Sequence, residues 1–139
     1  MNVRERKKLT ARLMTSLLRG DLPAVRALLR AEADPNAADR DGTTPLYLAA
    51  VQNERAAVRI LLAAGADPNV GSGRGDEGTP LTAAAAWGHD DVVRELLAQG
   101  ADPNLREDHG SGLSPLEWAV RNGNSKTQAL LEAAGATSP

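Results

Sequence analysis

The chain has 139 residues, a net charge of −2, no cysteine, no phenylalanine and only three aromatic side chains. This length is typical of one domain. The absence of cysteine excludes disulfide bonds, thiol catalysis and cysteine-ligated metal ions. It also gives no sign of an oxidising compartment, so we expect a cytoplasmic protein. No apolar run approaches the roughly 20 residues that a membrane-spanning helix needs, and the core must be built from aliphatic residues and alanine, which suits closely packed helices.

The first 30 residues form a basic segment. They carry eight basic and two acidic side chains, whereas residues 31–139 carry eight basic and sixteen acidic ones, so the net charges are +6 and −8. The two parts should therefore attract different partners. The basic run RERKK at Arg4 to Lys8 could bind nucleic acid, but no aromatic side chains accompany it for base stacking, and a solvated helix start accounts for it better. Arg12 and Arg19 interrupt the apolar stretch that follows, so we expect no signal peptide.

Nearly the same five letters recur at a regular interval along the chain. EADPN ends at Asn36, and GADPN ends at Asn69 and again at Asn104, so the asparagines are 33 and 35 residues apart. Such a period is typical of a structural repeat. Four segments come into phase when they are aligned on the turn positions Gly20, Asn53, Gly88 and Gly123.

The last three segments each open with a helix-start signal. Thr44, Thr79 and Ser114 offer a side-chain oxygen to free backbone amides, and a proline follows each of them at the first helical position. Glu117 lies three residues after Ser114 and completes a capping box. The helices that follow should bury apolar residues at spacings of three and four. These are Leu46, Ala49 and Ala50 in the second segment, Leu81, Ala84 and Ala85 in the third, and Leu116, Ala119 and Val120 in the fourth.

A second helix follows the turn of each segment. It should end at Gly65, Gly100 or Gly135, because a left-handed terminal residue is favourable only without a Cβ. A helix pair of this size cannot bury its apolar face alone, so the pairs must stack on one another. The buried positions expected in the second helices are Val58, Leu61 and Leu62, and then Val92, Val93, Leu96 and Leu97.

The order TPL, turn glycine, paired leucines and ADPN resembles the ankyrin repeat, whose signature includes T-P-L-H-x-A in a unit of roughly 33 residues. The resemblance implies an all-α solenoid of four helix-pair repeats with β-hairpin or loop fingers. It divides the single domain, residues 1–139, into repeats at about 9–42, 43–77, 78–112 and 113–137. Because the first and last repeats act as caps, we expect a monomer. The signature histidine is replaced by Tyr47, Thr82 and Glu117, so its hydrogen bond to threonine must be absent.

In the ankyrin family, the fingers and first helices line a concave surface that binds other proteins. The resemblance therefore implies a non-catalytic interaction module without a cofactor, acting as an inhibitor, an immunity-like protein or a scaffold. Trp87 takes the last position of a first helix, where the other repeats have polar residues. A large aromatic residue there can anchor an interface, or it can pack over its neighbours Val51 and Arg121.

The fingers carry acidic pairs, which would form a row of negative potential along the solenoid. Such a row favours a partner with a basic surface. The alternative is that aspartates there only fix the turns of the fingers. The residues expected to bind the partner are Trp87, Val51, Gln52, Arg121, Asp39, Asp41, Asp76, Glu77, Glu107 and Asp108.

Other interpretations concern single positions. The run His89-Asp90-Asp91 could serve a small enzyme as a metal or acid–base cluster, but both aspartates also suit a helix start. The other histidine lies in a separate finger, so no metal site is expected. Trp118 replaces a leucine-like position and should fill the interior of the last junction. Thirteen arginines against three lysines, with abundant alanine, fit a bacterial source.

Overall fold

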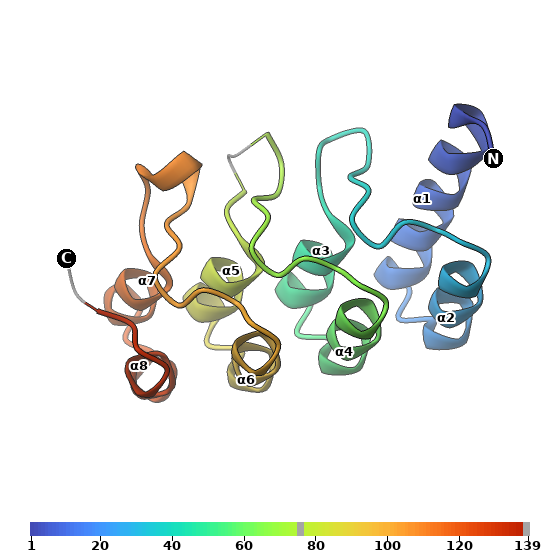
Figure 1. The fold of residues 1–139 in the computed structure, drawn as a ribbon. Helices are drawn as coiled ribbons and strands as arrows, with labels where there is room; N and C mark the ends of the chain where they lie inside the picture. Colours follow the sequence, from blue (N-terminus) through green and yellow to red (C-terminus); the bar gives the residue numbers. More distant parts are fainter. Residues whose placement is uncertain (75–76, 138–139) are drawn as a thin grey trace.

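The computed structural model describes residues 1–74 and 77–137. These residues form helices arranged in successive pairs, with loops that project to one side between the pairs (Figure 1). The expected β-hairpins are reduced, within the described residues, to a single antiparallel bridge between Ser72 and Gly78. The helices are α1 (Val3–Leu18), α2 (Leu22–Arg30), α3 (Pro45–Val51), α4 (Arg55–Ala63), α5 (Pro80–Trp87), α6 (Asp90–Ala98), a 3₁₀-helix η1 (Asp108–Gly110), α7 (Pro115–Arg121) and α8 (Ser125–Ala133).

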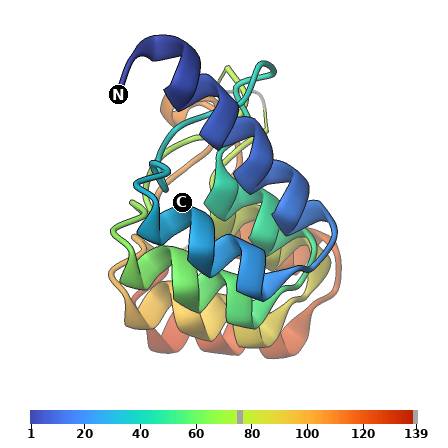
Figure 2. The same cartoon turned by 90° about the vertical axis from the view of Figure 1, so that its right-hand side faces the viewer.

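The α-helices form two layers. Helix α5 packs between α3 and α7 in the first layer, and α6 packs between α4 and α8 in the second. Figure 2 shows that α1 extends beyond the other helices of the stack; it has 16 residues, whereas α3 has 7. The all-α solenoid of helix pairs that the repeat predicts is confirmed.

Local hydrogen bonds fix the starts of the first-layer helices. Thr44, Thr79 and Ser114 are N-caps, and the side chain of each accepts from the backbone N–H three residues later, as predicted. The capping box at Ser114 and Glu117 is also confirmed, because the Ser114 N–H donates to Glu117 Oε1 at 3.1 Å. That hydrogen bond, supported by the Arg106 guanidinium 2.8 Å away, lowers the pKa of Glu117 below its ordinary range. Thr82 closes an equivalent box with Thr79, so this residue anchors α5 in place of the signature histidine.

Most of the predicted core positions are buried. The residues expected inside α3 and α5 are fully buried, as are Leu116 and Ala119 of α7. The prediction for Val120 is wrong: its side chain is 55% exposed, because α7 is the last helix of its layer and no described helix covers its outer side. Leu62 and Leu97 are half-buried. Gly65 and its two counterparts do end the second helices, with φ of +101°, +96° and +99°.

The asparagines of the ADPN motifs join successive repeats. Asn69 Nδ2 donates to the Gly100 carbonyl at 3.1 Å, and Asn69 Oδ1 accepts from the Asp102 N–H at 2.7 Å. Each asparagine therefore satisfies one acceptor and one donor of the following repeat, which explains why the motif recurs. The same pair of bonds connects Asn36 to Gly65 and Asp67, and Asn104 to Gly135 and Thr137.

Candidate functional site

A groove with a volume of about 540 Å³ lies between the first-layer helices and the bases of the fingers. All three aromatic side chains of the chain, Tyr47, Trp87 and Trp118, line it. Aromatic residues are enriched among those that dominate binding energy at protein interfaces. The rest of the lining is polar or small: Glu77, Thr82, Ala83, Ala86, Glu107, Asn122 and Asn124.

Trp87 is the most exposed of the large side chains in this groove. It is the last residue of α5, and 70% of its surface is exposed. Gly88 follows in a left-handed conformation with φ of +69°, which ends the helix and turns the chain toward α6. As predicted, Trp87 lies at the last position of a first-layer helix.

Trp118 lies in the wall of the groove and not in the interior, so that prediction is wrong. Leu116 and Ala119 occupy the inward face of α7, and the intervening tryptophan is therefore only half-buried. Its indole Nε1 donates to Glu107 Oε1 at 3.0 Å, and the guanidinium carbon of Arg121 lies 5.8 Å from its ring centroid. The side chain joins the third finger to α7.

Two glutamates from different fingers contribute carboxylates to the groove. Glu77 Oε1 accepts from the hydroxyls of Thr43 and Ser72 at 2.8 and 2.9 Å. Glu107 accepts from Trp118, and Gly78 leaves room for it, since a Cβ there would lie 2.8 Å from Glu107 Oε2. Both are half-buried, and within residues 1–74 and 77–137 neither forms an ion pair. The donors that hold these two carboxylates are hydroxyl groups and an indole N–H.

The other acidic residues of the expected row differ in what they do. Asp39 Oδ1 accepts from the backbone N–H of Asp41 and of Thr43, so its side chain fixes the turn of the first finger. Asp41 and Asp108 are exposed. Asp76 lies outside the described residues.

Three predicted residues from the first helices lie outside the lining of the groove. Val51 is half-buried, and its carbonyl oxygen lies 3.2 Å from His89 Nε2. Gln52 follows α3, and its buried Oε1 has no hydrogen-bond partner within the described chain. Arg121 is exposed and reaches the site only through the Trp118 ring.

Thus Trp87, Glu77 and Glu107 are the predicted residues that the groove brings together. The sequence pattern did not indicate Tyr47 or Trp118 at this site, nor the asparagines of the last turn, Asn122 and Asn124. Asn122 Nδ2 donates to the Ala86 carbonyl at 2.7 Å, which joins the ends of α5 and α7. The scarcity of aromatic residues was the available signal, because three in 139 residues all lie at one site.

The residues proposed for an enzyme or a nucleic-acid site do not join this groove. His89, Asp90 and Asp91 contact Val51, Thr127 and Arg94, respectively, so each serves a different structural contact. The basic run at residues 4–8 lies in the first turns of α1 with its side chains exposed, at the N-terminal end of the stack.

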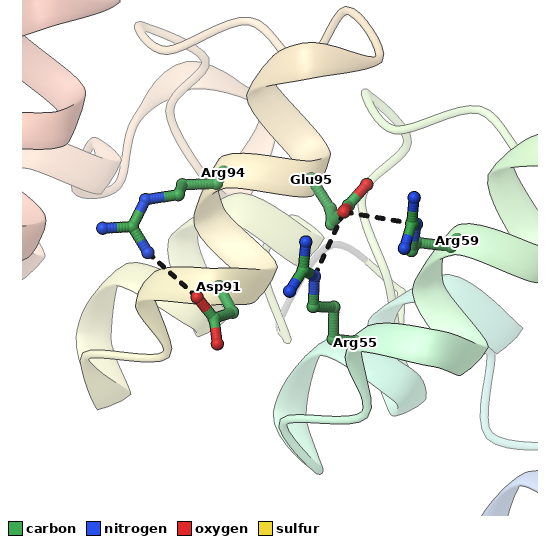
Figure 3. Close-up of polar contacts among 5 residues, drawn as sticks. All are labelled: Arg55, Arg59, Asp91, Arg94 and Glu95. Atoms are coloured by element: carbon green, nitrogen blue, oxygen red, sulfur yellow. Dashed lines mark hydrogen bonds and ion pairs between the residues drawn. The ribbon is translucent and has the colours of Figure 1, made fainter.

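An ion-pair cluster connects α4 and α6 in the second layer (Figure 3). Glu95 Oε1 lies 3.2 Å from Arg55 Nε and 3.3 Å from Arg59 Nε, and Arg94 pairs with Asp91 inside α6. The side chains of Arg55 and Arg59 are more than half exposed, so the ion pair of each with Glu95 contributes roughly 0–1 kcal/mol to stability. This cluster connects two helices of the second layer, and none of its residues line the groove.

Comparison with known families identifies the repeat. The family model described as ankyrin repeats (3 copies) matches residues 1–72 and 70–137. No curated protein matches the chain. Within the described residues, none of the helices combines the length and the apolar character that crossing a membrane requires.

Proposed function

Because this chain belongs to the ankyrin-repeat family, we propose that it binds a partner protein through the groove of Trp87, Trp118 and Tyr47 and the neighbouring fingers. Ankyrin repeats are generally protein–protein interaction modules, and the family is typically non-enzymatic. The chain acts in the cytoplasm as a monomer, as one domain of four repeats with capping ends. Its effect on the partner is that of an inhibitor, an immunity-like protein or a scaffold.

The exposure of Trp87 is the observation that carries this proposal. An aromatic side chain buries about 200 Å² when it is fully covered, so a residue that is 70% exposed leaves on the order of 140 Å² for a partner. At about 25 cal/mol per Å², covering that surface is worth on the order of 3 kcal/mol. This is the magnitude of a residue that dominates an interface.

The charge of the fingers favours a partner with a basic surface. Asp41 and Asp108 are exposed, and Glu77 and Glu107 face the groove without an ion pair within the described residues. Residues 31–139 carry a net charge of −8. Complementary charge speeds the encounter with a basic protein and excludes acidic ones.

Co-purification with a Trp87→Ala variant tests the proposal. The tagged protein, the variant and a matched control, Leu18→Ala, are each incubated with lysate of the host, and retained proteins are identified by mass spectrometry. Leu18 is an exposed apolar residue of α1, 63% exposed and outside the groove. We expect a basic protein that the unaltered chain and the control retain and that Trp87→Ala loses.

Two results would contradict the proposal. A specifically retained protein that binds Trp87→Ala and Leu18→Ala equally well would place the interface elsewhere. Retention of nucleic acid alone, lost when the basic run at residues 4–8 is removed and falling steeply with salt, would favour the basic end of the stack as the functional surface.

A further inference from the structure

We propose that the groove is a specific receptor for one arginine side chain of the partner, with the guanidinium stacked on Trp87 and hydrogen-bonded by Glu77 and Glu107. This inference rests on the proposed function, and it adds the chemistry of the residue that is recognised. The charge, the hydrogen-bond acceptors and the aromatic surface of the groove each point to a guanidinium.

The charge of the groove calls for a cation. Glu77 and Glu107 are half-buried in its wall, and their partners within the described residues are hydroxyl groups and an indole N–H, which carry no charge. A cation placed beside these carboxylates gains favourable electrostatic energy, which increases when the partner excludes water from the groove. Glu77 and Glu107 both line the groove, so a cation that enters it comes near two negative side chains.

The free acceptors require a cation with several N–H groups. Each carboxylate uses Oε1 for its contacts with the protein, and within the described part of the chain Oε2 of neither residue accepts a hydrogen bond. A guanidinium has five N–H donors in a planar fork and can reach two carboxylates from different directions. A quaternary ammonium group has no donor and would leave both Oε2 atoms unsatisfied.

The aromatic wall favours arginine over lysine. A guanidinium is planar and weakly hydrated, and it stacks on aromatic faces, whereas the lysine ammonium is compact and strongly hydrated. Arg121, outside the groove, already lies over the Trp118 ring at 5.8 Å from its centroid, so one indole of this site makes a guanidinium contact within the chain itself. Within the described residues no cationic side chain lies over Trp87, so its exposed ring is available to a partner.

Arg106, which precedes Glu107 in the third finger, is otherwise engaged. Arg106 Nη2 lies 2.8 Å from Glu117 Oε1, in an ion pair at the start of α7. A volume of about 540 Å³ is within the range of small-ligand sites and leaves room for a side chain together with part of its backbone.

Three short peptides test the inference. Each has one central residue, arginine, citrulline or lysine, between glycines, with both ends blocked. Citrulline matches arginine in shape but carries no charge. The two tryptophans of the chain both line the groove, so the two indole N–H signals in a ¹H–¹⁵N NMR spectrum report directly on its occupancy.

We expect saturable shifts of the Trp87 and Trp118 indole signals with the arginine peptide. Citrulline should bind at least about tenfold more weakly, and lysine should lie between the two. Glu77→Gln and Glu107→Gln should each weaken arginine binding by about tenfold, since an amide retains the Oε1 acceptor and replaces Oε2 by a donor. Glu132→Gln removes the same charge from an exposed position of α8 outside the groove and should leave binding unchanged.

Equal binding of arginine and citrulline, equal effects of Glu132→Gln and Glu107→Gln, or no saturable shift would each overturn the inference. If a glutamine variant fails to fold, the comparison of arginine with citrulline on the unaltered protein still decides. A partner that requires Trp87 while the arginine peptide fails to bind would overturn the arginine receptor alone. A partner that ignores Trp87 would overturn the proposed function itself.

Discussion

Replacing Asn69 by alanine should destabilise the stack although the residue is exposed. Asn69 comes from the second ADPN motif, and its amide donates to the Gly100 carbonyl at 3.1 Å and accepts from the Asp102 N–H at 2.7 Å. Both partners belong to the next repeat. The substitution removes a connection between repeats and leaves the core intact, because the apolar residues of α4 and α6 do not change.

The size of the effect follows from the two lost hydrogen bonds. A neutral hydrogen bond contributes about 1 kcal/mol to stability, and water can replace part of the loss at an exposed site. We therefore expect the free energy of unfolding to fall by about 1–2 kcal/mol. For a chain of this length, that corresponds to a decrease in Tm of roughly 3–8 °C.

Urea unfolding followed by circular dichroism measures this change, with Gln99→Ala as the matched control. Gln99 is also an exposed amide, at the C-cap of α6, but its side chain makes no hydrogen bond within the described residues, so its loss should stay within about 0.5 kcal/mol. Equal unfolding midpoints for Asn69→Ala and Gln99→Ala would show that the asparagine ladder does not stabilise the stack, and the explanation of the ADPN repeat would fail.

Two further predictions concern the fingers and the start of α7. Gly42→Ala should lower the urea midpoint more than Gly65→Ala. Both glycines have positive φ, which costs alanine roughly 1–2 kcal/mol, but a Cβ at Gly42 would also lie 2.9 Å from backbone atoms of Gly73, whereas nothing lies within 4 Å of a Cβ at Gly65. Equal decreases in the urea midpoint would contradict this prediction. Glu117 has a lowered pKa, so its contribution to stability is complete above its ordinary value of 4.5 and is lost as the pH falls through the lower value of the folded state. Unfolding midpoints measured from about pH 7 to about pH 3 should therefore fall less steeply for Glu117→Gln, and identical slopes would show that the carboxylate is not coupled to folding.

The helix starts and helix ends could be predicted from the sequence because they depend on neighbours a few residues away. The Ser114 cap and its Glu117 partner are three residues apart, and a C-terminal glycine needs only its own backbone angle. The stacking followed from the period, since a helix pair cannot bury its face alone. Val120 shows the limit of that argument: it has the core position of α7, but the neighbour that would cover it is absent from the described chain.

The groove could not be predicted because it depends on how each finger folds back on the helices. Glu77 reaches a hydroxyl 34 positions away at Thr43, and Glu107 reaches Trp118 at a separation of 11. No pattern of local spacing encodes these contacts. Trp118 was assigned to the core because its counterparts are Leu48 and Ala83, and only the contact with Glu107 shows that it faces the groove.

A division between shared and differing positions explains where the site lies. Positions that the repeats share, such as the caps and the ADPN asparagines, hold one repeat on the next, so a change there affects the whole stack. Positions that differ are free to carry recognition. The aromatic exceptions Trp87 and Trp118 come from neighbouring repeats and line one groove, and Glu107 from the finger between their helices accepts a hydrogen bond from Trp118. Because that finger contact both fixes Trp118 and places a carboxylate in the groove, binding at this site and the local order of the third finger should change together.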